Sequence, residues 1–535
     1  MRQNCPDVGN RGPGEAGMTA ASGPALSDAR RRSVLGSIVS VGSQGVRFAL
    51  RAGSMMALAR LLTPEDFGVQ GMVLVTTAFF ALFRDVGLTA VTVQRDSVSH
   101  EQLSTLFWIN VAVGAALTGL LVLASPAIAA FYGDARLTPV CIVSAVIFVI
   151  QGWSTQHYAL LQRQMRFGAL ALIESASVAL GGVVGVGMAL HAYGYWALVG
   201  MTVVTPLVTT IGCWTCLPWI PGPPRRHREL RSMLSIGGTL TLNGMVMYFA
   251  YNTEKILLGR FWGAEALGVY GRAYQLISLP SDLLTAGIAT VALPMLARFQ
   301  NDAERLHRAF LRGYAFVLSL TIPAIVSCAV CADDIVRIML GPQWDDVVPI
   351  FRLMVPTIVA FSLINPFGWF LISSGRTRRS LHIALFIAPV SILGAVFGIQ
   401  FGPKGVALAL SVMMTLLTVP VILCARAGTT MTLREIWRAL RCPLAAGLIA
   451  AIVGVGVNQG LDTLGSRAAR VILGAALVYG VYFLVLLGPL KQAGLYRDLL
   501  SHIARRSPSP DGAENSWNLA GRPRPQPACH DREQA

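Results

Sequence analysis

The chain has 535 residues, of which 54% are hydrophobic and only 13% are charged. A soluble globular protein cannot cover so much apolar surface with so few polar side chains, so this composition excludes a soluble enzyme and indicates an integral membrane protein. The formal net charge of +16 would suit a nucleic-acid-binding protein, and its placement along the chain decides whether that reading holds.

Residues 1–32 are predicted to form a disordered cytoplasmic tail. Their first 28 residues are rich in Gly, Ala and Pro and contain no apolar stretch of the kind a cleaved signal peptide needs. Met1 and Met18 both remain open as the start of the mature protein.

The apolar stretches predict a membrane protein built of helices. A helix needs about 20 residues to cross a hydrocarbon core of about 30 Å. Fourteen stretches meet this requirement: 38–62, 69–93, 103–127, 137–161, 168–190, 194–217, 232–259, 269–294, 309–331, 347–372, 380–401, 404–426, 442–460 and 468–489. The fold class is therefore expected to be all-α, with about 14 transmembrane helices, followed by a mostly disordered cytoplasmic tail over 491–535.

The basic residues gather in every second loop. One set of loops holds clusters such as Arg225, Arg226, Arg228 and Arg231, whereas the intervening loops hold single residues such as Arg60. The positive-inside rule places the Arg-rich loops and both termini in the cytoplasm. Membrane topology thus accounts for the net charge, and nucleic acid is not an expected partner.

The corner after the first predicted span is repeated in the sequence. "ARLLTPEDFGVQG" (59–71) returns as "GRFWGAEALGVYG" (259–271) at an offset of 200, with matching residues at Arg60/Arg260, Glu65/Glu265, Gly68/Gly268, Val69/Val269 and Gly71/Gly271. Thr63 suits a helix cap and Pro64 suits the first helical position, so each copy is expected to be a tight external turn.

An even number of spans separates the two copies, so both enter the membrane in the same orientation. This predicts two six-helix lobes in a parallel pseudo-two-fold repeat, followed by two C-terminal helices. A weaker similarity pairs Arg166 with Arg376, again in matching cytoplasmic loops. The expected divisions are an N-lobe over 33–217, a cytoplasmic linker over 218–231, a C-lobe over 232–426 and the last two spans over 427–490.

Charged residues inside apolar spans are costly and mark candidate functional positions. Arg47 and Arg51 are separated by one helical turn on the first span, and Gln44 continues the same face. Because guanidinium groups match phosphate oxygens, we expect this face to line a central cavity that accepts an anion.

Further charges lie in the predicted spans two, five, seven and eight, where snorkelling at span ends and mutual neutralisation are the structural alternatives. On span seven, polar residues share one face with a lysine. The candidates are Arg84, Asp85, Glu174, Tyr248, Asn252, Glu254, Lys255, Arg272 and Asp282.

Three stretches, "LARLLTPEDFGVQGMV", "ALLQRQMRFGALALIESAS" and "LPMLARFQND", resemble the polysaccharide-transporter branch of the multidrug, oligosaccharidyl-lipid and polysaccharide exporter superfamily. The resemblance covers about 33–490. It implies a flippase of the bacterial inner membrane that moves a polyprenyl-pyrophosphate-linked oligosaccharide to the periplasmic leaflet by alternating access, for lipopolysaccharide, capsule or exopolysaccharide synthesis. Membrane lipids, a polysaccharide polymerase and its chain-length machinery are the other implied partners.

The resemblance also assigns expected roles to residues. Related lipid-linked peptidoglycan precursor flippases place essential arginines in spans one, two and eight, and by helix position their counterparts are Arg47 or Arg51, Arg84 and Arg272. The expected head-group residues are Gln44, Arg47, Arg51, Arg84, Tyr248, Asn252, Lys255 and Arg272. A coupling proton or sodium ion on Asp85, Glu174, Glu254 or Asp282, and a counter-ion role for these acids, both stay open. Spans thirteen and fourteen are expected to flank a groove for the lipid tail.

Other chemistries are less consistent with the sequence. No cofactor or metal is expected, because the pairs Cys213/Cys216 and Cys328/Cys331 fall near opposite membrane faces and there is no Gly-Lys-Ser/Thr motif. "GVGVNQG" (454–460) is interpreted as close helix packing or as a chance match to a dinucleotide-binding loop. The alternatives to a flippase are a cation-coupled multidrug antiporter and, third, an integral-membrane glycan polymerase or ligase using Asp333, Asp334, Asp345 and Asp346.

Overall fold

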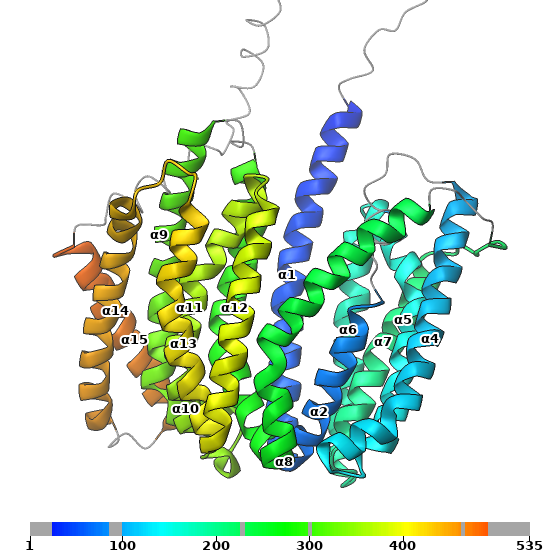
Figure 1. Cartoon of the computed structure of the whole chain (residues 1–535), viewed down its shortest axis with the longest axis horizontal. Coiled ribbons are helices and arrows are strands. Elements are labelled where there is room, and N and C mark those ends of the chain that lie inside the picture. Colours follow the sequence, from blue (N-terminus) through cyan, green and yellow to red (C-terminus); the bar gives the residue numbers. More distant parts are fainter. Residues whose placement is uncertain are drawn as a thin grey trace, which may run out of the picture. The chain divides into compact units, whose positions relative to one another are not determined.

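The computed structural model describes residues 24–84, 92, 99–224, 230–297, 302–461 and 466–490. Within these ranges all regular structure is helical, without strands (Figure 1). This confirms the predicted all-α class.

The first part of the chain forms long helices: α1 (Pro24–Leu61), α2 (Pro64–Ala81), α4 (His100–Tyr132), α5 (Leu137–Arg163), α6 (Phe167–Leu190), α7 (Trp196–Cys216) and α8 (Leu230–Ala297). The rest consists of α9 (Ala303–Val330), α10 (Ala332–Met339), η1 (Pro342–Trp344), α11 (Val347–Ser373), α12 (Thr377–Gly398), η2 (Ile399–Phe401), α13 (Gly402–Arg426), α14 (Leu433–Leu461) and α15 (Arg467–Leu487).

Nine helical segments of the described ranges are long and apolar enough to span a membrane. One of them, Arg378–Arg426, runs through two of the predicted spans. The protein is thus an integral membrane protein, while the total of fourteen spans stays a prediction.

The helix start predicted at Thr63 is present in the structure. The Thr63 side chain accepts a hydrogen bond from the Asp66 backbone N–H, the Asp66 carboxylate accepts one from the Thr63 backbone N–H, and Pro64 occupies the first turn. This capping box satisfies backbone donors that a helix start leaves unpaired. The short turn expected between the first two spans is confirmed, because α1 ends at Leu61 and α2 begins at Pro64.

The second copy of the corner is a break inside α8. Gly263 has φ 80° and ψ −172°, so the ribbon labelled α8 is two helices joined by a kink. A positive φ favours glycine because other residues strain there. The break falls between the predicted spans 232–259 and 269–294.

The described chain divides into two compact units. Of the described residues, the first unit contains those up to Gly271 with Met339–Trp344 and Ala395–Pro403, and the second contains Arg272–Ile338, Asp345–Gly394 and those from Lys404 onward. In the first, α4 packs on α5, α6 packs on α7, and α1 lies along α6; in the second, α14 contacts both α9 and α15. The predicted lobe boundaries stay a prediction.

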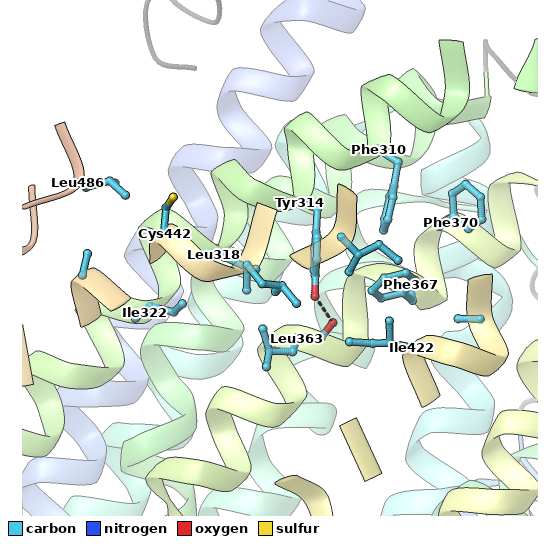
Figure 2. Close-up of a cluster of buried hydrophobic side chains, with 14 of the residues drawn as sticks. Phe310, Tyr314, Leu318, Ile322, Leu363, Phe367, Phe370, Ile422, Cys442 and Leu486 are labelled. Carbon is cyan, nitrogen blue, oxygen red and sulfur yellow. Dashed lines mark hydrogen bonds between the residues drawn. The ribbon is translucent and has the colours of Figure 1, made fainter. Parts of the chain in front are cut away.

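An aromatic core holds the second unit together (Figure 2). The ring of Phe310 stacks on Tyr314 with centroids 5.6 Å apart, and Phe367 and Phe370 pack against the same ring from α11. The Tyr314 hydroxyl donates a hydrogen bond to the Leu363 carbonyl over 2.8 Å. A buried hydroxyl without a partner would be destabilising, so this bond fixes the register of α9 against α11.

Candidate functional site

Arg47, at the centre of the predicted cationic face on α1, is paired with an acid from another helix. Its guanidinium forms an ion pair with Glu174 of α6, and the two side chains are 14% and 28% exposed. The Tyr158 hydroxyl of α5 donates to the other oxygen of the same carboxylate. Of the two roles open for Glu174, this arrangement supports that of counter-ion.

Arg51 lies one turn further along α1 and is exposed, as is Gln44 on the same face. Among the described residues none forms a hydrogen bond or ion pair with the Arg51 side chain. The face that the sequence predicts therefore contains one guanidinium paired with an acid and one without a partner among the described residues. With respect to the part of the chain that the structure describes, the donors of Arg51 are available to an anion.

A second polar group lies on the first helix of α8. Lys255 Nζ is 3.1 Å from Asn252 Oδ1 and 3.8 Å from the carboxylate of Glu254, which is buried. The Asn252 side chain donates to the Tyr248 carbonyl over 3.0 Å, and the Tyr248 hydroxyl donates to Val75 in α2. The predicted polar face is thus a connected row whose cation has an adjacent acid.

The remaining predicted residues lie elsewhere. The Arg84 guanidinium donates to Gln151 of α5, and Asp85 lies outside the described residues. In the second unit, Arg272 donates to Gln275 over 2.5 Å and Asp282 is exposed. The predicted residues thus form two groups, an ion pair of Arg47 with Glu174 and a hydrogen bond of Lys255 with Asn252. Arg84 and Arg272 form hydrogen bonds with Gln151 and Gln275, which the sequence did not predict.

Tyr158 and Gln151 are the site residues that sequence reasoning missed. Tyr158 and Glu174 lie equally far along the chain from Arg166, in the short turn that joins α5 to α6. Residues equidistant from the turn of an antiparallel helical hairpin lie at the same depth, so a tyrosine opposite an acid was a usable signal. For Gln151 the sequence offers no comparable symmetry.

The acidic residues around α10 are engaged by arginines. Asp334 pairs with Arg470 of α15 over 2.7 Å, with both side chains mostly buried, and Asp333 pairs with Arg352. The hydrogen bond from Arg337 holds the pKa of Asp345 below its usual range. Three of the four acids named for the alternative polymerase or ligase are thus paired with arginines, as in a structural junction.

The glycine-rich motif in α14 has a packing role at Gly454. A Cβ at Gly454 would lie 2.9 Å from Val478 and 3.1 Å from Val330, so α14 approaches its neighbours closely at this glycine, as interpreted from the sequence. Within the ranges that the structure describes, no group of three or more His, Cys, Asp or Glu side chains is placed to hold a metal ion.

Comparison with known proteins gives these arrangements a context. Residues 57–349, more than half of the chain, match the family described as "Polysaccharide biosynthesis protein". The chain is 28% identical to the teichuronic acid biosynthesis protein TuaB of Bacillus subtilis (strain 168), over 63% of this chain and 69% of TuaB. It is 27% identical to the lipopolysaccharide biosynthesis protein WzxC of Escherichia coli (strain K12), over 71% of this chain and 78% of WzxC.

A solved structure shares the fold. The lipid II flippase MurJ in an inward closed conformation superposes with a TM-score of 0.67 and 14% identity, over 86% of this chain and 100% of that chain. At this identity the likeness concerns the fold alone. The family match confirms the resemblance to polysaccharide proteins read from the sequence, and the chain belongs to the family described as "Polysaccharide biosynthesis protein".

Proposed function

We propose that this protein is a flippase of the bacterial inner membrane that transfers polyprenyl-pyrophosphate-linked oligosaccharides from the cytoplasmic to the periplasmic leaflet. It acts as a transporter and not as an enzyme, which is supported by a relative named as a transport protein and by the shared fold of a flippase. The observation that supports a phosphate-bearing substrate is the exposed guanidinium of Arg51 beside the paired Arg47 on α1.

The main energetic barrier to transfer is the movement of the substrate's polar head group through the hydrocarbon core. Phosphates and sugar hydroxyls lose their hydration in about 30 Å of hydrocarbon, and each unsatisfied polar group there costs several kcal/mol. A polar protein surface substitutes for water, while the prenyl chain stays in lipid. Arginine suits this task because its planar fork binds two phosphate oxygens at once and keeps its charge away from water.

Arg51 and Arg47 take different parts in this proposal. Arg51 binds the pyrophosphate first, because no displacement of a described partner is needed. Arg47 joins when a phosphate oxygen replaces the Glu174 carboxylate. The released carboxylate keeps its hydrogen bond from Tyr158 and can take up a proton or sodium ion, which would supply ion coupling.

The wider cycle is part of the same proposal. The two repeats alternate between inward and outward access through a cationic central cavity, both termini face the cytoplasm, and the lipid tail uses a groove beside the last two spans. No cofactor takes part, and a polysaccharide polymerase with its chain-length machinery receives the product. The family match and the shared fold support this cycle.

The decisive experiment combines gene deletion with a leaflet assay. Lipid-linked oligosaccharide is quantified on each side of the membrane, with surface polymer, after rescue by wild type or by Arg47→Ala/Arg51→Ala. Loss of two charge-assisted phosphate contacts is expected to reduce transfer by about a hundredfold. Arg308→Ala is the matched control, because Arg308 is 66% exposed on α9 and pairs only loosely with Glu304.

Two results would contradict the proposal. If the intermediate reaches the periplasmic leaflet without the gene, the protein does not flip it. If only sensitivity to cationic drugs changes, the multidrug antiporter takes its place.

A further inference from the structure

The first turns of α14 carry a basic and aromatic surface that takes no part in the proposed transport. Its four side chains are exposed, and Trp437 among them is 60% exposed. They follow one another at helical spacing and therefore lie on one side of the helix. This surface, here named the basic face of α14, consists of Arg434, Trp437, Arg438 and Arg441.

The opposite side of the same turns is fixed to the protein. Ile436 and Leu440 are 2% and 7% exposed and belong to the apolar core that α14 shares with α9 and α15. A hydrogen bond from the Thr432 backbone N–H to the Glu435 carboxylate, 2.9 Å long, caps the helix start. These contacts set the rotation of α14 about its axis, so the basic face is held pointing away from the protein.

The basic face continues along α14 as an apolar stripe. Leu448 and Ile452 lie on the same side of the helix as Arg441, and they are 65% and 66% exposed. Because α14 is long and apolar enough to span a membrane, these exposed side chains face acyl chains. From Arg441 to the end of α14 at Leu461 the helix extends about 30 Å, which matches the hydrocarbon core. The arginines therefore lie at the level of the lipid head groups.

The charges of the basic face are not balanced by acids of the protein. Within the ranges that the structure describes, the side chains of its three arginines form no hydrogen bond or ion pair. Glu435 is the acid of these turns, but it accepts a hydrogen bond from the Thr432 hydroxyl over 2.7 Å and lies 3.5 Å from His307. The basic face is thus complementary in charge to an anion outside the protein.

The neighbouring helix provides an internal comparison. Near its start α9 also carries three exposed arginines, Arg305, Arg308 and Arg312, and it contacts α14. There, Arg305 lies 2.9 Å from Asp302 and Arg308 lies 3.5 Å from Glu304. Positive charge at the cytoplasmic end of a span satisfies the topology rule on both helices. Only α14 combines arginines that lack an acid with an exposed tryptophan and an apolar stripe.

We propose that the basic face of α14 is a binding site for an anionic phospholipid of the cytoplasmic leaflet. The guanidinium groups bind the phosphate oxygens, and the indole of Trp437 lies at the boundary between head groups and acyl chains. The acyl chains lie along Leu448 and Ile452. This apolar stripe favours a phospholipid over a free phosphate, which has nothing to place there. The site binds a resident membrane lipid and not the transported substrate, so it goes beyond the proposed function.

Native mass spectrometry of the purified full-length protein tests this site. The protein is titrated with phosphatidylglycerol and, separately, with phosphatidylcholine of the same acyl chains and with inorganic pyrophosphate. Wild type is expected to bind phosphatidylglycerol about tenfold or more tightly than either of the others, because only this lipid combines a net negative head group with acyl chains.

Removal of the three charges is expected to weaken binding of phosphatidylglycerol strongly. Each arginine near an anionic lipid contributes about fivefold, so Arg434→Gln/Arg438→Gln/Arg441→Gln should lose about a hundredfold in affinity. The matched control removes as many arginines from the same end of α9, as Arg305→Gln/Arg308→Gln/Arg312→Gln, and should stay within about twofold of wild type.

Several results would overturn the lipid site. Equal losses in the two triple variants would mean that the lipid responds only to net charge. Equal binding of phosphatidylcholine would exclude a role for the anionic head group, and equal binding of pyrophosphate would exclude a role for the acyl chains. If the triple variant of α14 does not fold, Arg438→Gln alone should still lose about fivefold, and unchanged affinity would contradict the proposal.

A second measurement locates the lipid. A photoactivatable phosphatidylglycerol in lipid nanodiscs should form cross-links that map to residues 433–452, with a yield reduced about fivefold or more by the triple substitution on α14. Cross-links confined to α9 would refute the site. Neither measurement depends on transport, so failure of the lipid site and failure of the flippase proposal are read from different experiments.

Discussion

Arg47 and Arg51 share a helix face and a residue type, yet their surroundings differ. Arg47 is held by Glu174 and, through it, by Tyr158, whereas Arg51 is exposed. A partly buried ion pair adds little net stability, but removing one partner leaves a charge without compensation. Substitution of Arg47 should therefore affect both stability and substrate binding, whereas substitution of Arg51 should affect substrate binding alone.

Arg47→Ala is expected to lower both stability and transport, because Glu174 loses its counter-ion. The stability loss should be about 1–3 kcal/mol, less than for a fully buried pair because water reaches both side chains. Arg51→Ala should lower transport without shifting the melting temperature. Thermal unfolding in detergent and the leaflet assay measure the two effects.

The double variant Arg47→Ala/Glu174→Gln provides the matched control. It removes both charges, so stability should recover while transport stays low. If adding Glu174→Gln to the Arg47→Ala variant restores transport, Arg47 does not bind the substrate and only neutralises Glu174.

At the scale of helices, two sequence patterns that resemble functional motifs have structural roles instead. They are the acidic residues at α10 and the glycine-rich part of α14. Asp334 ties α10 to Arg470 of α15, so the carboxylate belongs to a helix junction. Gly454 lets α14 pack closely on Val478 and Val330, whereas Gly456 has nothing within 4 Å of a Cβ. Two glycines of one motif therefore have different roles.

This contrast predicts different tolerance to a larger side chain. Gly454→Leu should destabilise the protein by about 1–3 kcal/mol, because the leucine overlaps Val478 and Val330. Gly456→Leu, on the same helix, should change stability little. Melting temperatures of the two purified variants provide the comparison, and equal losses would contradict close packing at Gly454.

For the chain as a whole, the distribution of arginine predicts its orientation in the membrane. Arg163 ends α5 and Arg166 lies in the turn after it, whereas the loop before α5 carries Arg136 in contact with Asp134 and Glu65. Basic residues retained in the cytoplasm orient the adjoining spans.

Reporter fusions on either side of α5 check this orientation. A fusion after Asp134 should give periplasmic alkaline phosphatase activity, and a fusion after Arg166 should give cytoplasmic fluorescence. A full-length fusion after Ala535 should also fluoresce. Phosphatase activity at both Arg166 and Ala535 would reverse the topology and place the repeated corner on the cytoplasmic side.

The helical class, the cap at Thr63 and the short turn before α2 could be predicted from the sequence, because hydropathy and capping are local properties. The break at Gly263 was implied by the repeat, since a second corner was expected there. The partners of Arg47 and Arg84 could not be predicted, because they come from α6 and α5 and depend on how these helices rotate about their axes.

Residue order and composition were sufficient to establish a membrane-embedded, all-helical protein with a repeated corner, since these follow from apolar length, charge placement and an internal offset. Three-dimensional packing was needed to reveal that Glu174 neutralises Arg47, that arginines occupy the acids around α10, and that Gly68 and Gly268 face each other's helix start. Such contacts join residues that are far apart in the chain. The sequence gives the residue type at each position, but it does not give the residue that each one contacts in the fold.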